Sequence, residues 1–480
     1  MPKRSARSPS AESSLSSAAD DLLEASKSEV KGKPANGGKK RKAVTTTTKT
    51  TAVKRTKRTT AATIIDEEDV EETTDDKTRA IMKRVARTKK TVIQDPLAPR
   101  TQDSLVRIGA HVSTAGGIHN AIVNLLHIGA NAFALFMKNQ RKWDNPPLDP
   151  EFARLFIAGC AEHGIDVAAC CLPHGSYLVN LAHPDAERKK QAYDSFLNDL
   201  ARCHTLGIKL YNFHPGNANA TTREEGIRLI AQNINEAHQN PSTGDVVAVL
   251  ETMASHGNTI GGTFSDLAEI IKLVDNKDRV GVCLDTCHVF AAGYDLRTPK
   301  AYAATMKEFD DVIGLKYLKA LHMNDSKAPL SSHRDLHANI GTGYLGLSSF
   351  HNIVNDKRLH GLPMVLETPI DSIDDNGKKI EDKGIWAHEI KMLESLVGMD
   401  IESDEFKELA ANLEAQGKGE RDKINDQVER KKVKDAKSTK TKKAAAATTK
   451  TKDAKPKNSR AKKKKKVETE DEENEEDEEE

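Results

Sequence analysis

The stretch Gly281-Val-Cys-Leu-Asp-Thr-Cys-His288 joins a short apolar run to a carboxylate and an imidazole. A buried parallel strand reads as a continuous apolar run, and in an α/β barrel the residues at the C-terminal end of such a strand face the active site. We therefore interpret residues 281–285 as a buried strand with Asp285 and His288 at its functional end. A single acid or histidine after a strand is more often a cap or a turn residue, so the interpretation depends on repetition of the pattern.

The pattern repeats along the chain. The predicted strands are 106–111, 132–136, 167–171, 209–213, 246–251, 281–285, 318–323 and 363–367. The predicted amphipathic helices are 118–127, 151–163, 186–206, 223–238, 264–274, 301–313, 348–354 and 385–396. Eight strand and helix units at this spacing predict right-handed crossovers and a closed (β/α)8 TIM barrel. The alternative, a doubly wound open sheet, lacks its Gly-x-Gly-x-x-Gly motif after the first strand.

The polar residues are concentrated at the two ends of the chain. Over all 480 residues, 37% are hydrophobic and 4% aromatic, which is too polar for one compact domain of that size. We divide the chain into a disordered basic tail (1–104), a barrel domain (105–398) and a charged disordered C-terminal tail (399–480), because segments poor in large apolar residues cannot offset their ordering entropy.

Both tails carry charge clusters. Basic runs such as Lys39-Lys-Arg-Lys42 and Lys54-Arg-Thr-Lys-Arg58 predict recognition by nuclear import factors and a nuclear location, with a mitochondrial fraction left open. The chain ends in an almost purely acidic run, 468–480. All six cysteines fall in the barrel span without a CxxC pair, as expected for reduced thiols in an intracellular protein. No run of eighteen apolar residues occurs, so we expect no membrane span, and we expect a monomer.

Acids and imidazoles recur at or just after the predicted strand ends. With His111 left aside, they are His174, His214, Glu251, Asp285, His288, His322, Asp335, His337 and Glu367. Such a buried cluster needs compensating positive charge, which metal ions supply. Nitrogen and oxygen ligands without thiolate suit Zn²⁺, with Mn²⁺ or Fe²⁺ as substitutes, and nine ligands exceed what one tetrahedral ion can use. If one carboxylate bridges two ions, nine side chains serve three metals with positions left open for water and substrate, and such a centre predicts hydrolysis of a phosphate ester.

Several stretches resemble the endonuclease IV family of class II apurinic/apyrimidinic (AP) endonucleases, over residues 108–396. They are Ile108-Gly-Ala-His-Val-Ser113, Phe133-Ala-Leu-Phe136, Lys138-Asn-Gln-Arg-Lys-Trp143, Leu172-Pro-His-Gly-Ser-Tyr-Leu-Val-Asn-Leu181, Asn212-Phe-His-Pro-Gly216, residues 281–299, and Leu321-His-Met-Asn-Asp-Ser-Lys327. The resemblance implies a TIM barrel with three zinc ions that cleaves double-stranded DNA 5′ to an abasic site, leaving a 3′-hydroxyl and a 5′-deoxyribose phosphate. It also implies removal of blocking groups from 3′ ends, by 3′-phosphodiesterase and 3′-phosphatase activity, in base excision repair.

The resemblance further implies a role for each site residue. One zinc would be held by His174, His214 and Glu251; a second by Glu251, Asp285, His322 and Glu367; the third by His288, Asp335 and His337. Glu251 and Glu367 would be catalytic. Arg141, Tyr177 and Leu178 would enter the DNA stack and hold the abasic nucleotide out of the helix, as wedge residues do in other proteins that distort DNA.

The chain departs from the family pattern at four places that are not ligands. Thr252-Met253 stands where Asn-Thr is expected, Thr342 replaces the Glu of a Gly-Glu-Gly, Ser331 replaces a Gly, and Val179 replaces Ile or Met. We expect these positions to affect the surroundings of the metals and the loop geometry, and through them rate and substrate preference.

Two other classes of protein fit parts of the pattern. A sugar isomerase or epimerase barrel also places His, Glu and Asp at strand ends around divalent metals, but it needs fewer ligands and no basic tails. A catalytically inactive chromatin-binding protein would use the tails and keep the barrel as a scaffold, which the complete set of nine ligand-type residues argues against.

Overall fold

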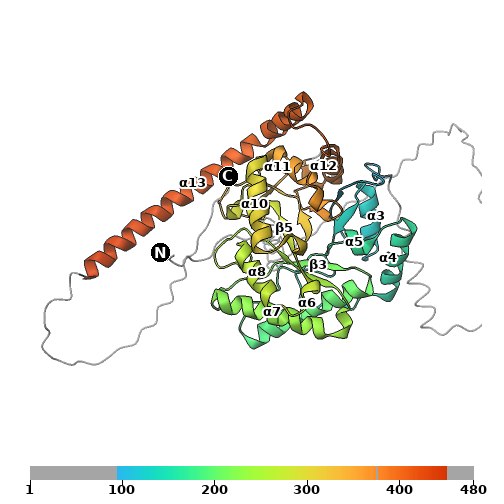
Figure 1. Ribbon diagram of the computed structural model, residues 1–480, viewed down its shortest axis with the longest axis horizontal. Coiled ribbons are helices and arrows are strands. Elements are labelled where there is room, and N and C mark those ends of the chain that lie inside the picture. The colour runs from blue at the N-terminus through green and yellow to red at the C-terminus, as the bar shows by residue number, and fades with distance from the viewer. Residues whose placement is uncertain (1–94, 375–376, 451–480) are drawn as a thin grey trace, which may run out of the picture. The chain divides into compact units, whose positions relative to one another are not determined.

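The computed structural model describes residues 95–374 and 377–450, and its contacts divide the chain into two units after Asn425. The first unit holds a parallel sheet at its centre (Figure 1). Its strand order is β2-β1-β9-β6-β5-β4-β3. The strands are β1 (Arg107–His111), β2 (Ala132–Ala134), β3 (Leu210–Phe213), β4 (Val247–Glu251), β5 (Val280–Asp285), β6 (Leu318–His322) and β9 (Pro363–Leu366). All neighbouring pairs are parallel, as predicted.

The third predicted strand is the one that differs. Residues 167–170 form a single helical turn, α5 (Val167–Cys170), and only then does the chain extend. Isolated parallel bridges join Cys171 to Phe133 on one side, and His174 to both Phe136 and Asn212 across the gap between β2 and β3. Two alanines give this segment little β-preference, so tertiary context decides its conformation. The extended stretch from Cys171 to His174 still fills the eighth position and closes the (β/α)8 barrel.

The inside of the barrel is a small apolar core. Seven buried side chains form it: Ala134, Leu172, Leu210, Val249, Cys283, Ala320 and Val365. A larger buried cluster includes the side chains that join the outer face of the sheet to the helices. Because a barrel of eight strands is filled by side chains, this inner layer forms a packed floor beneath the C-terminal ends of the strands.

The helices surround the strands (Figure 1). They are α3 (Asn120–His127), α4 (Pro150–Glu162), α6 (Ala186–Thr205), α7 (Arg223–Gln239), α8 (Phe264–Leu273), α9 (Thr286–Ala292), α10 (Pro299–Val312), α11 (Gly346–Val354) and α12 (Lys383–Ser395). Short 3₁₀ turns lie at Pro241–Thr243, Lys277–Arg279, Leu315–Tyr317 and Lys357–Leu359. The eight predicted helices are all present within a few residues of the expected ends. No helix among the described residues has the length and apolar character needed to cross a membrane.

Local sequence signals set several helix starts. The Asp149 carboxylate accepts from the backbone N–H of Glu151, with Pro150 as the first helical residue of α4. At α8, Thr263 and Asp266 cap each other's backbone N–H groups in a reciprocal box. Proline at the first position and a Ser, Thr or Asp cap satisfy N–H groups that have no partner inside the helix.

Two short antiparallel pairs stand apart from the barrel sheet. One joins β7 (Asp325–Ser326) to β8 (His337–Ala338), and the other joins β10 (Asp371–Ile373) to β11 (Lys379–Glu381). Both lie in the segments that follow barrel strands β6 and β9. The first pair brackets the loop that carries Asp335.

The ordered chain extends past both expected tail boundaries. Leu97 donates a backbone hydrogen bond to His127, and Arg100 binds Asn131, so residues 95–104 pack on the barrel instead of belonging to a disordered tail. Residues expected in the C-terminal tail form the helix α13 (Asp404–Lys450), with Phe406 and Leu413 buried. The sequence did not predict this helix, because its few apolar residues are outnumbered by charged ones. The basic clusters before residue 95 and the acidic end lie outside the described residues.

Candidate metal centre

The nine predicted ligand residues lie together at the C-terminal ends of the barrel strands. They form three groups in which one ligand atom per residue lies within 4.8 Å of the others: His174, His214 and Glu251; Glu251, Asp285, His322 and Glu367; and His288, Asp335 and His337. Glu251 belongs to two groups, and the membership is the one that the family resemblance implied. All are buried except His214 and Asp335, which are half-buried.

Backbone carbonyls orient three of the histidines. The Nδ1 atoms of His174, His288 and His337 lie 2.7, 2.8 and 3.3 Å from the carbonyl oxygens of Gly175, Thr252 and Glu367, respectively. A carbonyl only accepts, so each Nδ1 carries the proton and each Nε2 presents its lone pair. A metal-binding histidine is usually held by such a hydrogen bond on its other nitrogen.

His322 turns its other nitrogen toward the cluster. Its Nδ1 lies 3.1 Å from Glu251 Oε1 and 3.3 Å from Glu367 Oε2. Asp285 Oδ2 is 3.7 Å away from the same nitrogen. The fourth histidine of the buried set therefore faces three carboxylates at once, which is the surrounding expected of a ligand in an oxygen-rich group.

The third group shows the geometry of ligands around a common point. Nε2 of His288 and Nε2 of His337 lie 2.9 and 3.1 Å from the two oxygens of Asp335. Despite these distances, both nitrogens and Asp335 Oδ1 are buried without a hydrogen bond to the described residues. Lone pairs that face one another without a shared proton fit a cation placed between them, so the residues present suit a metal ion.

The electrostatics indicate the same need for positive charge. Burial alone would raise the pKa of Glu251, but His322 and His214 hold it well below its usual value. Burial would also raise the pKa of Asp335, which His288 and His337 lower far below normal. Conversely, burial would lower the pKa of His337, and Asp335 raises it to about 9. Either protons on the imidazoles or metal ions must balance the buried carboxylates.

Cys287 lies close enough to Asp285 and His337 to form a further group with them. Burial raises the pKa of its thiol well above normal, and the nearby carboxylates of Asp335 and Asp285 add to the shift. Its Sγ lies 3.7 Å from the carbonyl oxygen of Leu336, to which the thiol donates. This hydrogen bond occupies the thiol, and the three groups formed by the nine predicted ligands do not include Cys287.

Two side chains to which the sequence reasoning assigned no role, those of Asn212 and Asn324, hold carboxylates in place, and Thr252 fixes the backbone beside one of them. Asn212 Nδ2 donates to Glu251 Oε2 at 2.6 Å, and Asn324 Nδ2 donates to Asp285 Oδ2 at 2.7 Å. The hydroxyl of Thr252 accepts from the backbone N–H of Asp285 at 2.9 Å. Asn212 and Asn324 belong to strand-end stretches whose ligands were identified, so an amide close to a ligand was the signal that could have found them.

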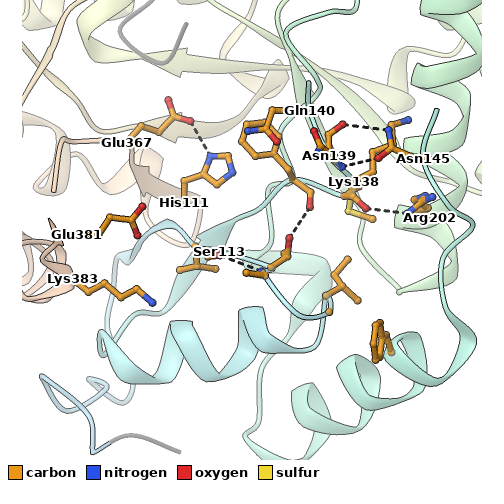
Figure 2. A pocket seen from close by; sticks show the side chains of 18 of the residues that line it. His111, Ser113, Lys138, Asn139, Gln140, Asn145, Arg202, Glu367, Glu381 and Lys383 are labelled. Atoms are coloured by element: carbon orange, nitrogen blue, oxygen red, sulfur yellow. Dashed lines mark hydrogen bonds and ion pairs between the residues drawn. The ribbon is translucent and has the colours of Figure 1, made fainter. Parts of the chain in front are cut away.

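His111, set aside in the sequence reasoning, also borders the centre. Its Nδ1 lies 3.4 Å from Glu367 Oε1, and Figure 2 shows the imidazole turned toward that carboxylate. Its Nε2 is buried without a hydrogen bond to the described residues. Burial lowers the pKa of His111 despite the opposing effect of Glu367, so at neutral pH the ring is an uncharged donor or acceptor beside the metal ligands.

A cavity of about 1320 Å³ opens beside the centre (Figure 2). His111, His337 and Glu367 line it, together with Lys138 and Lys327. It is larger than the roughly 300–1,000 Å³ of a typical small-molecule pocket. Basic and acidic side chains both line it, among them Lys383, Arg202, Asp149 and Glu381, so an extended polar ligand suits its size.

The loop after β2, which carries Arg141, is held firmly at both ends. The Arg202 guanidinium donates to the carbonyl of Met137 at 3.1 Å and to the carbonyl of Pro146. Asn145 Oδ1 accepts from the backbone of Asn139 at 3.0 Å, a contact visible in Figure 2. Arg141 itself is exposed at the tip of this loop.

The other two predicted DNA-contacting residues lie at the rim of the centre. The Tyr177 ring sits 5.3 Å from the His174 ring and 5.6 Å from the His214 ring. Its hydroxyl is buried and has no hydrogen bond to the described residues. Leu178 is 39% exposed, an unusual position for a leucine next to a polar site. Their contact with DNA remains a prediction.

The departures from the family pattern have local consequences. Ser331 stands where glycine is common and has φ 59°, a left-handed conformation that costs an L-residue roughly 1–2 kcal/mol. Thr252 orients both Asp285 and His288, as described above. Val179 is buried. The backbone of Thr342 lies against α13.

Glu389 on α12 gives a pH-dependent prediction. Its carboxylate accepts from the backbone N–H of Ile340 at 2.7 Å and is 3% exposed, and burial raises its pKa to about 7. Because the folded pKa exceeds the unfolded one, the folded state binds more protons, and stability falls as pH rises from about 4.5 through 7. Glu389→Gln mimics the protonated form, so at pH 8 it should stabilise the protein by on the order of 2 kcal/mol.

The measurement is the free energy of unfolding of both proteins at pH 5 and pH 8. At pH 5 the two should differ little, since wild-type Glu389 is then protonated. Comparing variant with wild type at each pH removes the pH effects that come from the metal centre. An equal difference at both pH values would show that Glu389 does not titrate with a raised pKa.

Several known proteins are similar to this chain. The model of the xylose isomerase-like TIM barrel family matches residues 123–396. Apurinic-apyrimidinic endonuclease 1 of Schizosaccharomyces pombe is 44% identical over 313 residues, which are 65% of this chain and 88% of that protein. Probable endonuclease 4 of Campylobacter curvus is 47% identical over 290 residues, 60% of this chain and 97% of that protein. The crystal structure of endonuclease IV from Thermus thermophilus has 28% identity and a TM-score of 0.50, covering 60% of this chain and 98% of that one.

Proposed function

The chain belongs to the xylose isomerase-like TIM barrel family, and within it to the AP endonucleases of the endonuclease IV family, and we propose that its barrel repairs DNA by hydrolysing the phosphodiester bond 5′ to abasic sites. The observation that supports this most strongly is the set of three ligand groups at one end of the barrel, two of which share Glu251. A sugar epimerase barrel has no use for so many ligands.

We propose three Zn²⁺ ions as the cofactor, with Mn²⁺ or Fe²⁺ as substitutes. His174, His214 and Glu251 would hold the first, while Asp285, His322 and Glu367 with Glu251 would hold the second. The third would be held by His288, Asp335 and His337. When bound, such ions lower the pKa of water, neutralise phosphoryl oxygens and stabilise a leaving alkoxide.

The side chains around the ligands hold the carboxylates in position for the hydrolysis. Asn212 and Asn324 fix the carboxylates of Glu251 and Asp285, so the centre is preorganised before DNA binds. Water attacks phosphorus, the bond from phosphorus to the 3′-oxygen breaks, and that oxygen takes a proton to become the 3′-hydroxyl. The deoxyribose keeps the 5′-phosphate.

DNA binding would use the rim of the centre. Tyr177 and Leu178 lie beside the first ligand group, and Arg141 projects from a loop that Arg202 clamps. We propose that these three residues enter the stack and keep the abasic nucleotide outside the helix. Removal of blocking groups from 3′ ends would use the same hydrolysis at a strand terminus. The basic clusters before residue 95 would bind nuclear import factors and place the enzyme in the nucleus.

The test is incubation of the purified protein with a labelled duplex that bears one abasic site. We expect a single cut, with a 3′-hydroxyl on one product and a 5′-deoxyribose phosphate on the other. An undamaged duplex of the same sequence should stay intact. Epimerisation of a ketose without incision would replace the proposed function with that of a sugar epimerase.

A further inference from the structure

The first part of α13 packs on the loop between β8 and α11. Within the unit that ends at Asn425, the Leu413 side chain lies against Gly341, where an added Cβ would come within 2.7 Å of it. Gly417 approaches still closer: a Cβ at its position would fall 1.8 Å from the carbonyl oxygen of Thr342. The helix backbone therefore touches the loop backbone, a contact that only glycine permits.

Polar contacts surround this close approach. The Arg421 guanidinium donates to the same Thr342 carbonyl, and the Tyr344 hydroxyl donates to the Arg421 carbonyl at 3.3 Å. Lys327 Nζ lies 2.9 Å from Glu420 Oε1. The family model ends at residue 396, so this helix lies beyond the part of the chain that the family match covers.

The same loop is held from the barrel side by a buried carboxylate. Asp325 accepts from the backbone N–H groups of Gly343, Leu345 and Gly346 at 3.0, 2.9 and 3.2 Å. Thr342 adds a hydrogen bond from its hydroxyl to the Asn339 carbonyl at 2.7 Å. The loop is thus pinned between the barrel and α13.

The pinned loop continues directly into two ligands of the third group. Asn339 is two residues from His337, and the Lys327 N–H donates to the Leu336 carbonyl at 2.9 Å, between Asp335 and His337. In this region β7 and β8 contribute only two residues each to regular structure. A ligand-bearing loop with so little secondary structure depends on what it packs against.

We propose that residues 404–425 of α13 are a positioning element for the His288, Asp335 and His337 metal group, with Gly417 as the residue that lets the helix dock. The inference rests on the proposed function, since it takes this group to be a metal site. Substitution of a residue that supports a metal ligand without touching the metal typically lowers metal affinity or activity 10–100-fold. Helix α13 contacts the ligand-bearing loop at Gly341 and Thr342 and acts on the ligands through that loop, so we expect an effect at the lower end of that range.

The experiment compares two substitutions in the full-length protein, Gly417→Ala and Gly419→Ala. Both give the helix a residue with higher helix propensity, but a Cβ at Gly419 would meet nothing within 4 Å. Metal release is titrated with a chelator, and incision of an abasic duplex gives kcat and KM. We expect Gly417→Ala to lose one of three ions at about tenfold lower chelator concentration, with kcat reduced about tenfold and KM nearly unchanged. Gly419→Ala should match wild type.

Equal metal release from Gly417→Ala and Gly419→Ala, with both active, would overturn the positioning role and leave the proposed function intact. Failure of wild type and Gly419→Ala to incise or to bind three ions would instead refute the proposed function. If Gly417→Ala does not fold, Arg421→Met serves as the second variant, because it removes a contact to Thr342 without inserting an atom between the backbones. Arg421→Met should then lose one ion selectively, as expected for Gly417→Ala. If Arg421→Met instead released its metal as the wild type does, the inference would be overturned.

Discussion

Glu251→Gln is expected to lower kcat for abasic-site incision by on the order of a thousandfold or more while leaving the protein folded and able to bind DNA. The Glu251 carboxylate lies 3.1 Å from Nε2 of His174 and 3.1 Å from Nδ1 of His322, and it belongs to two ligand groups. Glutamine keeps the shape but removes the charge and one acceptor. It therefore weakens both groups at once, whereas loss of any other single ligand in these two groups weakens one.

The matched control is Glu236→Gln, an exposed glutamate on α7. Incision is measured at steady state for kcat and in single turnover for the rate of cleavage, and binding is measured with an uncleaved duplex. Phosphate contacts supply most of the affinity of such complexes, so binding should change little in Glu251→Gln. Incision within tenfold of wild type would show that Glu251 does not bridge two ions. Loss of binding and incision together would indicate a fold defect, which the unfolding transition would reveal.

The cluster of ionisable side chains could be predicted because several buried strands end in one of them. The buried run of β5 stops at Asp285, and the same change from apolar to ionisable occurs at Glu251 and His322. Strand periodicity and parallel topology then bring these ends to one face of the barrel. Residues more than a hundred positions apart could for that reason be predicted to gather on one face, while their division into three groups came from the family resemblance.

The parts that could not be predicted depend on contacts between distant segments. The helical turn of α5 replaces a strand because its alanines have no strong preference and the neighbouring strands decide the outcome. Helix α13 was missed because charged residues flank Phe406 and Leu413, and only the docked loop shows why Gly417 is small. Asn212 and Asn324 were missed for a similar reason. An amide does not reveal its partner until the fold supplies one.

Removal of metal is expected to abolish incision and to destabilise the barrel. If each of the three ligand groups holds one ion, as we propose, metal analysis should return close to three ions per chain. Each ion present at a thousandfold above its Kd stabilises the folded state by about 4 kcal/mol, so the metal-free protein should unfold at a clearly lower temperature. Without ions, the buried carboxylates of Glu251 and Asp335 depend on protonated imidazoles for their balancing charge.

The same charges give the pH dependence of metal binding. Ligating histidines must be neutral, and in the metal-free protein Asp335 raises the pKa of His337 to about 9, so protons compete with the third ion up to that pH. Ion affinity at this group should therefore rise with pH between 6 and 9, measured by competition with a chelator whose own proton binding is known. Adding Zn²⁺ back to the metal-free protein should restore incision and the unfolding temperature together. A metal-free sample that still cuts, or a fully active one with a single ion per chain, would contradict three ions held by nine side chains.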